Sequence, residues 1–230
     1  MTQLVLVRHG QASFGGNNYD VLSPTGQRQA AVIGEHLARL DHGFDALYAG
    51  RMLRQQDTAR LAGHADFTVD AAFDEYDFQG ILRAYLPVVA REQPELGLMQ
   101  DNPYNHLFND PKLFQAVFEQ SIRRWLVDGA HDGAAVETWR QFKTRVVDGL
   151  QRIAKPGRER VAVFTSGGVI AVATQQALGV DDLTAFKLNW RIANASLHRY
   201  KLGSSGLSLL GYNDITHLLL QKDPKLVTFR

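Results

Sequence analysis

The chain has 230 residues, 45% of them hydrophobic, with a formal net charge of +1 and no cysteine. Its length and composition are typical of a single soluble domain with room for an insertion, and its small charge argues against nucleic acid or a membrane surface as a partner. The lack of cysteine excludes disulfides and thiolate metal sites, and no apolar stretch approaches the ~20 residues that span a bilayer, so a cytoplasmic location is expected.

The first predicted element is a buried strand, Leu4–Val7, which runs directly into Arg8-His9-Gly10. Ser23 and Pro24 predict the N-cap and the first residue of a helix, which apolar residues at helical spacing continue to about Gly43. A strand, a helix and a third strand follow over Ala46–Ala49, Leu53–Leu61 and Phe67–Val69. This alternation predicts an α/β fold, a three-layer α/β/α sandwich with a mostly parallel sheet.

Residues 81–135 interrupt the alternation of strands and helices within a single predicted domain, 1–230. Apolar residues at helical spacing, among them Leu82, Leu86 and Val89, predict a helical insertion. Such an insertion either caps a site or adds a packing layer, and the pattern favours neither.

The strand and helix pattern then resumes. An apolar stripe from Trp139 to Ile153 predicts a helix behind Thr138 as N-cap, and Val161–Phe164 is a further buried strand. A helix over Val169–Leu178 comes next. Two alternating segments joined by a Gly-Ser-Ser-Gly turn predict a C-terminal hairpin, over Ala195–Leu202 and Leu207–Tyr212. The last residues, 222–230, are expected to form a short tail.

Reactive or anion-binding residues follow the ends of four predicted strands: Arg8 and His9, Arg54, Glu75, and Ser166-Gly167-Gly168. At the third position, Asp74 and Asp77 fit the spacing as well as Glu75 does. Taken singly, each residue is better explained by a structural role than by a catalytic one. Examples are a hydrogen-bonded histidine, a solvated arginine and a turn carboxylate. Because the ends of parallel strands converge at one edge of a sheet, the set as a whole favours a functional site.

The combination suits phosphoryl transfer. Guanidinium groups bind phosphate oxygens in a bidentate manner, and a helix start offers backbone N–H groups to an anion. A neutral imidazole is a competent nucleophile toward phosphorus, and a carboxyl group can protonate the leaving oxygen.

Several segments resemble one known family. The segment Leu4–Gln11 looks like the signature of the histidine phosphatase superfamily, which includes the cofactor-dependent phosphoglycerate mutases. The similarity continues through further segments in the same order, namely Leu22–Gly26, Gln29-Ala30, Arg54, Thr58-Ala59, Glu75, Phe78–Gly80 and Val163–Ile170. The last segments resemble the broad phosphatase branch more than the mutases, at Asn194–Ser196, Asn213-Asp214 and His217-Leu218.

The resemblance implies roles for individual residues. His9 would be the nucleophile that forms a phosphohistidine, and Glu75 would be the general acid and then the base. Arg8, Arg54 and the backbone at Gly167 would bind the phosphoryl group. The expected activity is a metal-independent phosphatase acting on a small phosphorylated substrate, with no metal or other cofactor, because the arginines supply the positive charge.

Two positions depart from the family pattern. Ser166 stands where the family has its second histidine, and a serine donates one hydrogen bond but carries no positive charge. A histidine restored there is expected to raise turnover unless the site has been rebuilt around serine. The family's asparagine after the first motif is also missing; Gly15 stands near that position and Ser13 is the candidate substitute. Three histidines elsewhere are candidates to compensate: His106, His131 and His198.

Three alternative functions remain open from the sequence. One is a phosphoglycerate mutase-like phosphotransferase, and another is a catalytically weak phospholigand-binding protein. The third is a serine esterase that uses Ser166, whose nucleophile elbow requires glycine two residues before and two after the serine. Gly168 fits that requirement and Phe164 does not.

Overall fold

The computed structural model describes residues 1–13, 20–39, 43–97, 107, 110–127 and 136–229. It divides into two compact units. The first comprises Met1–Glu75 and Arg145–Arg230, and the second comprises Tyr76–Thr144.

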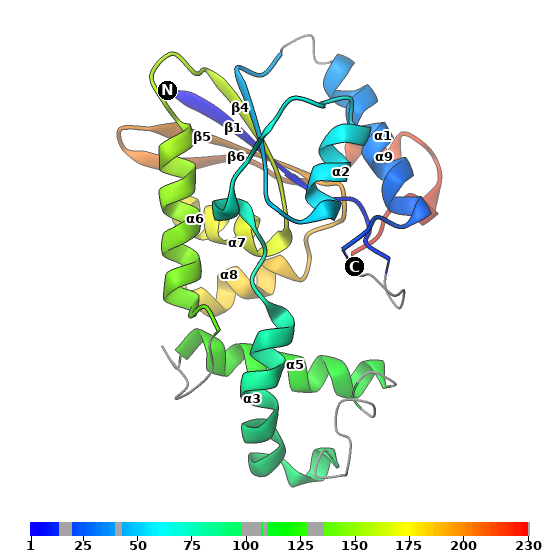
Figure 1. Cartoon of the computed structure of the whole chain (residues 1–230), viewed down its shortest axis with the longest axis vertical. Helices are drawn as coiled ribbons and strands as arrows, with labels where there is room; N and C mark the ends of the chain where they lie inside the picture. Colours follow the sequence, from blue (N-terminus) through cyan, green and yellow to red (C-terminus); the bar gives the residue numbers. More distant parts are fainter. Residues whose placement is uncertain (14–19, 40–42, 98–106, 108–109, 128–135, 230) are drawn as a thin grey trace. The chain divides into compact units, whose positions relative to one another are not determined.

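The first unit contains a six-stranded sheet in the order β3-β2-β4-β1-β5-β6 (Figure 1). Its strands are β1 (Thr2–Arg8), β2 (Ala46–Ala49), β3 (Thr68–Val69), β4 (Arg160–Thr165), β5 (Leu197–Gly203) and β6 (Gly206–Asp214). All pairs among the first four strands are parallel, whereas β5 pairs antiparallel with β1 and with β6. The predicted α/β fold, with its mostly parallel sheet and C-terminal hairpin, is confirmed.

Helices cover both faces of this sheet (Figure 1). One face carries α1 (Pro24–Arg39), α2 (Leu53–Leu61) and α9 (Thr216–Leu219), and the other carries α7 (Gly167–Leu178), α8 (Asp182–Asn189) and the C-terminal part of α6 (Trp139–Ile153). Side chains alternate along a strand, so Val5 and Val7 of β1 point to the first face. There they join a buried cluster that includes Ile33 of α1, Ala59 of α2 and Leu218 of α9.

The C-terminal residues differ from the expected tail. They form a short helix, η3 (Pro224–Leu226), and Leu226 is only 1% exposed. The buried amide of Gln29 in α1 donates to the Leu226 carbonyl at 2.8 Å and to Thr228 Oγ1 at 3.0 Å. Because a buried amide needs acceptors, these contacts hold the segment against α1. No periodicity in the sequence signals such contacts.

The second unit is built around α3 (Phe78–Glu92) and α5 (Pro111–Val127), with a short helix, η2 (Pro94–Leu96), after α3. Leu82, Leu86 and Val89 are at most 2% exposed, as their spacing predicts. Trp125 lies 5.2 Å, between ring centroids, from both Tyr76 and Trp139. A cap role for these helices stays a prediction. None of the helices in the described part of the chain is long and apolar enough to cross a membrane.

The loop after β1 lies directly on the first turn of α1. A Cβ atom at Gly26 would lie 2.1 Å from the carbonyl oxygen of Gln11, and one at Gly10 would lie 2.4 Å from the Gly26 oxygen. Both neighbours are backbone atoms, so no side chain can move aside. Glycine at these two positions therefore keeps the loop that carries His9 close to α1.

We predict that Gly26→Ala lowers the free energy of unfolding by about 1–3 kcal/mol, because the backbone must shift to admit the methyl group. Urea denaturation measures the change. Gly43→Ala is the matched control, since its Cβ would meet nothing within 4 Å and the expected change is within about 0.5 kcal/mol. Equal values for the two variants would contradict the packing described above.

Candidate functional site

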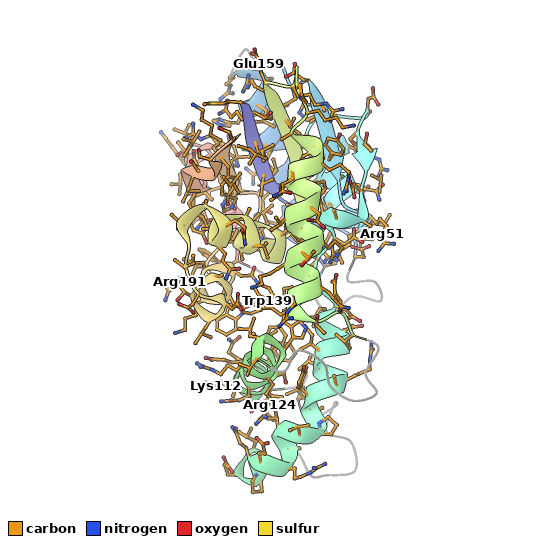
Figure 2. The ribbon with its side chains drawn as sticks, turned by 90° about the vertical axis from the view of Figure 1, so that its left-hand side faces the viewer. Arg51, Lys112, Arg124, Trp139, Glu159 and Arg191 are labelled. Atoms are coloured by element: carbon orange, nitrogen blue, oxygen red, sulfur yellow. The ribbon has the colours of Figure 1, made fainter. Side chains whose placement is uncertain are left out.

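The strands β1, β2 and β4 end at the same edge of the sheet because they run parallel. Glu159, just before β4, and Arg51, just after β2, mark the two opposite ends (Figure 2). At the carboxyl end, the backbone N–H of His9 donates to the carbonyl of Thr165 at 2.9 Å. This bond brings the residues after β1 next to those after β4, so His9 and Ser166 leave the sheet from adjacent strands.

His9 is buried, with 5% of its surface exposed. Its Nδ1 lies 2.7 Å from the Gly10 carbonyl, which only accepts, so Nδ1 carries the hydrogen. The Nε–H of Arg54 donates to Nε2 at 3.2 Å. Burial, followed by the charges of Arg54 and Arg8, holds the pKa of His9 well below its ordinary value, although the Gly10 bond acts in the opposite direction. The imidazole is therefore neutral, with an unprotonated Nε2.

Arg54 lies in the first turn of α2 and is 7% exposed. Its Nη1 donates to Asp20 Oδ1 at 2.7 Å, and the other oxygen of Asp20 accepts from the backbone N–H of Leu53 at 2.8 Å. Thr58 Oγ1 donates to the Arg54 carbonyl at 2.6 Å and accepts from the Gly10 N–H at 3.0 Å. These bonds tie the start of α2 to the loop that carries His9.

Arg8 is held by backbone carbonyls. Its Nη1 donates to the oxygens of Ile192 and Phe229, the second at 3.3 Å. The C-terminal segment, expected from the sequence to be a tail, thus anchors an arginine of the site. The guanidinium charge lies close enough to lower the pKa of both His9 and His198.

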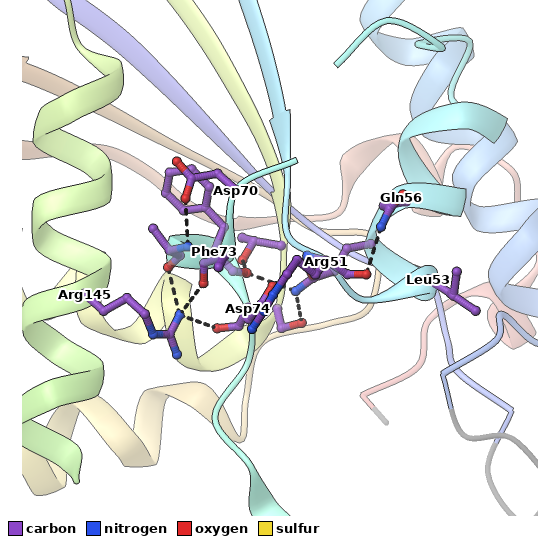
Figure 3. A network of polar contacts seen from close by, with 12 residues as sticks. Arg51, Leu53, Gln56, Asp70, Phe73, Asp74 and Arg145 are labelled. Atoms are coloured by element: carbon purple, nitrogen blue, oxygen red, sulfur yellow. Dashed lines mark hydrogen bonds and ion pairs between the residues drawn. The ribbon is translucent and has the colours of Figure 1, made fainter. Parts of the chain in front are cut away.

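Of the three candidate carboxyl groups, the one at the start of α7 is Glu75. Both of its oxygens lie 3.1 Å from the backbone nitrogen of Gly168. Asp74 instead accepts from the N–H and the Nε–H of Arg51, both at 2.6 Å (Figure 3). Asp77 belongs to the second unit, where it caps α3 through Gly80.

The turn before Glu75, η1 (Ala71–Phe73), is held at each of its carbonyls. Nη1 of Arg145 lies 2.7 Å from the Ala71 oxygen, 3.1 Å from that of Ala72 and 3.3 Å from that of Asp74 (Figure 3). The Phe73 carbonyl accepts from Thr165 Oγ1 at 2.7 Å and from Gln55 Nε2 at 3.1 Å. Sequence reasoning missed both Arg145 and Gln55, since neither stands in a motif or at a strand end.

Ser166 is fully buried, and its Oγ accepts from Gln55 Nε2 at 2.8 Å. Its backbone is extended, with φ −125° and ψ 172°, whereas the nucleophile elbow of a serine hydrolase is strained. The neighbouring Gly167 packs against Asn189, whose Oδ1 would lie 2.1 Å from an added Cβ. The geometry of this turn therefore gives no support to a serine esterase.

The remaining sequence candidates have hydrogen-bond partners outside the contacts described above. Ser13 donates its backbone N–H to the Val21 carbonyl at 2.8 Å, and its role in phosphate binding stays a prediction. His198 bonds through Nε2 to Ser196 Oγ at 2.9 Å and accepts at Nδ1 from Asn213 N–H at 3.2 Å. Burial lowers the pKa of His198 to about 3, so it supplies no positive charge near neutral pH. Three other positions lie outside the described residues: Gly15, His106 and His131.

The charged groups of the site suit an anion. Across the described ranges, no group of three or more His, Asp or Glu side chains lies together so as to hold a metal. Two guanidinium groups, those of Arg8 and Arg54, lie near the neutral imidazole of His9, and their positive charges lower its pKa in addition to the larger effect of burial. Such groups bind phosphate oxygens well.

At neutral pH, nitrogen-15 NMR is expected to show His9 as the neutral tautomer with hydrogen on Nδ1, because its pKa lies well below the ordinary value. Arg54→Met removes one of the two neighbouring charges and should raise the pKa of His9. The pKa of His9 should still lie below its ordinary value in this variant, because burial, the larger cause of the shift, remains. A doubly protonated ring at pH 6.5 in the unaltered protein would contradict this assignment.

Arg145→Met should lower the free energy of unfolding by about 1–3 kcal/mol, because three carbonyls lose a charged donor. The turn before Glu75 should loosen, so the Gly168 amide exchanges faster with solvent. Denaturation and hydrogen exchange measure these effects. Arg140→Met, at an exposed arginine of the same helix, is the control. Unchanged exchange at Gly168 would show that Arg145 does not hold this turn.

Comparisons with known proteins agree with this fold. Three similar solved structures are a phosphoserine phosphatase variant from Entamoeba histolytica in complex with phosphoserine, a mycobacterial glucosyl-3-phosphoglycerate phosphatase and a phosphoglycerate mutase from Bacillus anthracis. Their identities to this chain are 18%, 19% and 16%, with TM-scores of 0.63, 0.62 and 0.60. The matches cover 95%, 93% and 96% of this chain and 100%, 99% and 97% of the others, respectively.

At these identities the structural matches establish a shared fold. No curated protein sequence matches the chain. The family model of the histidine phosphatase superfamily (branch 1) matches residues 4–117 and 111–215, which is most of the chain. The chain therefore belongs to the histidine phosphatase superfamily.

Proposed function

We propose that this protein is a metal-independent phosphatase that hydrolyses small organic phosphomonoesters through a phosphohistidine on His9. The observation that carries the proposal is the buried, neutral imidazole of His9, whose unprotonated Nε2 lies 3.2 Å from the guanidinium of Arg54. A nucleophilic nitrogen next to an anion-binding group suits attack on a phosphate ester. Family membership and the phosphatases among the similar structures support the same reaction.

In the first half of the proposed reaction, His9 Nε2 attacks phosphorus while the bond from phosphorus to the ester oxygen breaks. The carboxyl group of Glu75 gives its proton to the departing oxygen, which leaves as an alcohol. The guanidinium groups of Arg8 and Arg54 bind the phosphoryl oxygens and stabilise their charge in the transition state. The products are the free alcohol, a phosphohistidine and ionised Glu75.

In the second half, water attacks the phosphorus of the phosphohistidine. The carboxylate of Glu75 takes a proton from this water, and the bond between phosphorus and Nε2 breaks. Inorganic phosphate leaves, and His9 and Glu75 return to their first protonation states. The arginines supply positive charge throughout, so the reaction needs no metal ion.

Ser166 weakens this machinery relative to a site with two histidines. Loss of one preorganised hydrogen-bond donor typically costs on the order of 10²–10³ in rate. The nucleophile His9 is retained, so we propose a phosphatase of reduced activity rather than an inactive binding protein.

We predict that the protein hydrolyses p-nitrophenyl phosphate in the presence of a chelator. His9→Ala should lower kcat at least roughly 10³-fold, and Glu75→Gln roughly 10²–10⁴-fold, because they remove the nucleophile and the proton donor. His36→Ala, a histidine outside the site, is the control. Quenching in alkaline denaturant during turnover should trap a phosphoenzyme that is stable to base and labile to acid, and His9→Ala should form none.

Three outcomes would contradict the proposal. Activity that survives His9→Ala would exclude the phosphohistidine route, and activity lost with the chelator would indicate a metal-dependent reaction. Hydrolysis of p-nitrophenyl acetate that disappears in Ser166→Ala would point to an esterase instead.

A further inference from the structure

Gln55 and Ser166 form a fully buried pair in the site, and both residues are 0% exposed. Gln55 directly follows Arg54 in α2, and Ser166 is the N-cap residue of α7. The distance from Gln55 Nε2 to Ser166 Oγ is 2.8 Å. Ser166 stands at the position where the resemblance to the family places a second histidine, and Gln55 is its hydrogen-bond partner.

The direction of this hydrogen bond is set by a third group. Nε2 of Gln55 also lies 3.1 Å from the carbonyl oxygen of Phe73, which only accepts. A reversed amide would place two oxygens against each other, so Nε2 must be the atom near both neighbours. An amide nitrogen only donates, so Ser166 Oγ is the acceptor from Gln55.

The hydroxyl proton of Ser166 therefore points away from Gln55. Within the described part of the chain, no hydrogen bond takes up this proton, although Ser166 is fully buried. A hydroxyl donates one proton and can accept two hydrogen bonds, of which the bond from Gln55 is one. That proton remains for a substrate oxygen.

The amide of Gln55 carries a cost to stability. Its Oε1 is buried with no partner among the described residues, and an unpaired buried oxygen is unfavourable. This oxygen also requires a glycine beside it, since a Cβ at Gly50 would lie 2.0 Å from Oε1. A protein tolerates such a local cost most readily where the group serves a function.

We infer that Gln55 is a positioning residue that aims the hydroxyl proton of Ser166 at the transferring phosphoryl group. The inference rests on the proposed phosphatase function and adds to it a neutral donor in place of an imidazole. Gln55 acts only through Ser166, so its contribution to the rate depends on that serine. A residue that merely held η1 through Phe73 would contribute equally with or without Ser166.

A double-mutant cycle with p-nitrophenyl phosphate tests this dependence. Ser166→Ala should lower kcat roughly 10²-fold, and Gln55→Met, which keeps the side-chain length but removes the amide, about tenfold. In the Ser166→Ala background, Gln55→Met should lower kcat less than about twofold. Thr165→Val is the matched control, because it removes the other donor to Phe73 and should lower kcat by the same factor in both backgrounds.

The cycle separates the two proposals. Equal losses for Gln55→Met in both backgrounds would overturn the inference, while His9→Ala would still abolish turnover. Activity that is independent of His9 would overturn the phosphatase mechanism itself. Thermal unfolding of each variant, with and without inorganic phosphate, identifies losses that come from unfolding.

A second experiment tests whether the side-chain amide of Gln55 leaves room for a histidine at position 166. Ser166→His alone should lower kcat, because an imidazole at this buried position collides with Gln55 Nε2. The double variant Gln55→Ala, Ser166→His makes room for the ring and should exceed the single variant about tenfold in kcat. A single variant as active as the unaltered protein would show that Gln55 does not shape the site, and would overturn the inference.

Discussion

The parallel pairing of β1 with β4 is the constraint on which the site depends. It places the N–H of His9 2.9 Å from the Thr165 carbonyl, so the two segments that leave the sheet do so side by side. The pairing brings residues 9 and 166 together without a long ordered loop, which would cost conformational entropy. The close contact of Gly10 with Gly26 then keeps the first segment against α1.

Burial of this site is compatible with stability because its charges are matched. The imidazole of His9 is neutral, the guanidinium of Arg54 meets Asp20 at 2.7 Å, and that of Arg8 meets backbone carbonyls. A buried guanidinium without such partners would be strongly unfavourable. A bound phosphate dianion would add to this arrangement as a further partner for the arginines, so the same groups serve the empty and the occupied site.

Some parts of this site were readable from sequence and others were not. The convergence of His9, Arg54 and Ser166 could be predicted, because each follows a buried strand. A short apolar run followed by glycine or arginine can be recognised in the local sequence. Gln55 and Arg145, whose hydrogen bonds hold the turn before Glu75 and the Ser166 hydroxyl, have no such local pattern. Their partners lie 18 to 111 residues away in the chain. The packing of residues 222–230 was missed for the same reason: it depends on the buried amide of Gln29 in another element.

A serine that is hydrogen-bonded to an amide does not ionise, whereas a histidine at the same position could gain a proton as the pH falls. In the proposed reaction, the positive charge available to a phosphoryl group would come from the guanidinium groups of Arg8 and Arg54, and guanidinium groups keep their protons in proteins. The imidazole of His9 contributes no charge, because burial and these same arginines keep it neutral. The Ser166–Gln55 pair does not titrate either. On the proposed mechanism, the charge of the side chains that would bind phosphate is therefore constant near neutral pH. The ionisation of the phosphate ester and of the proposed general acid, Glu75, would then shape the pH dependence of turnover.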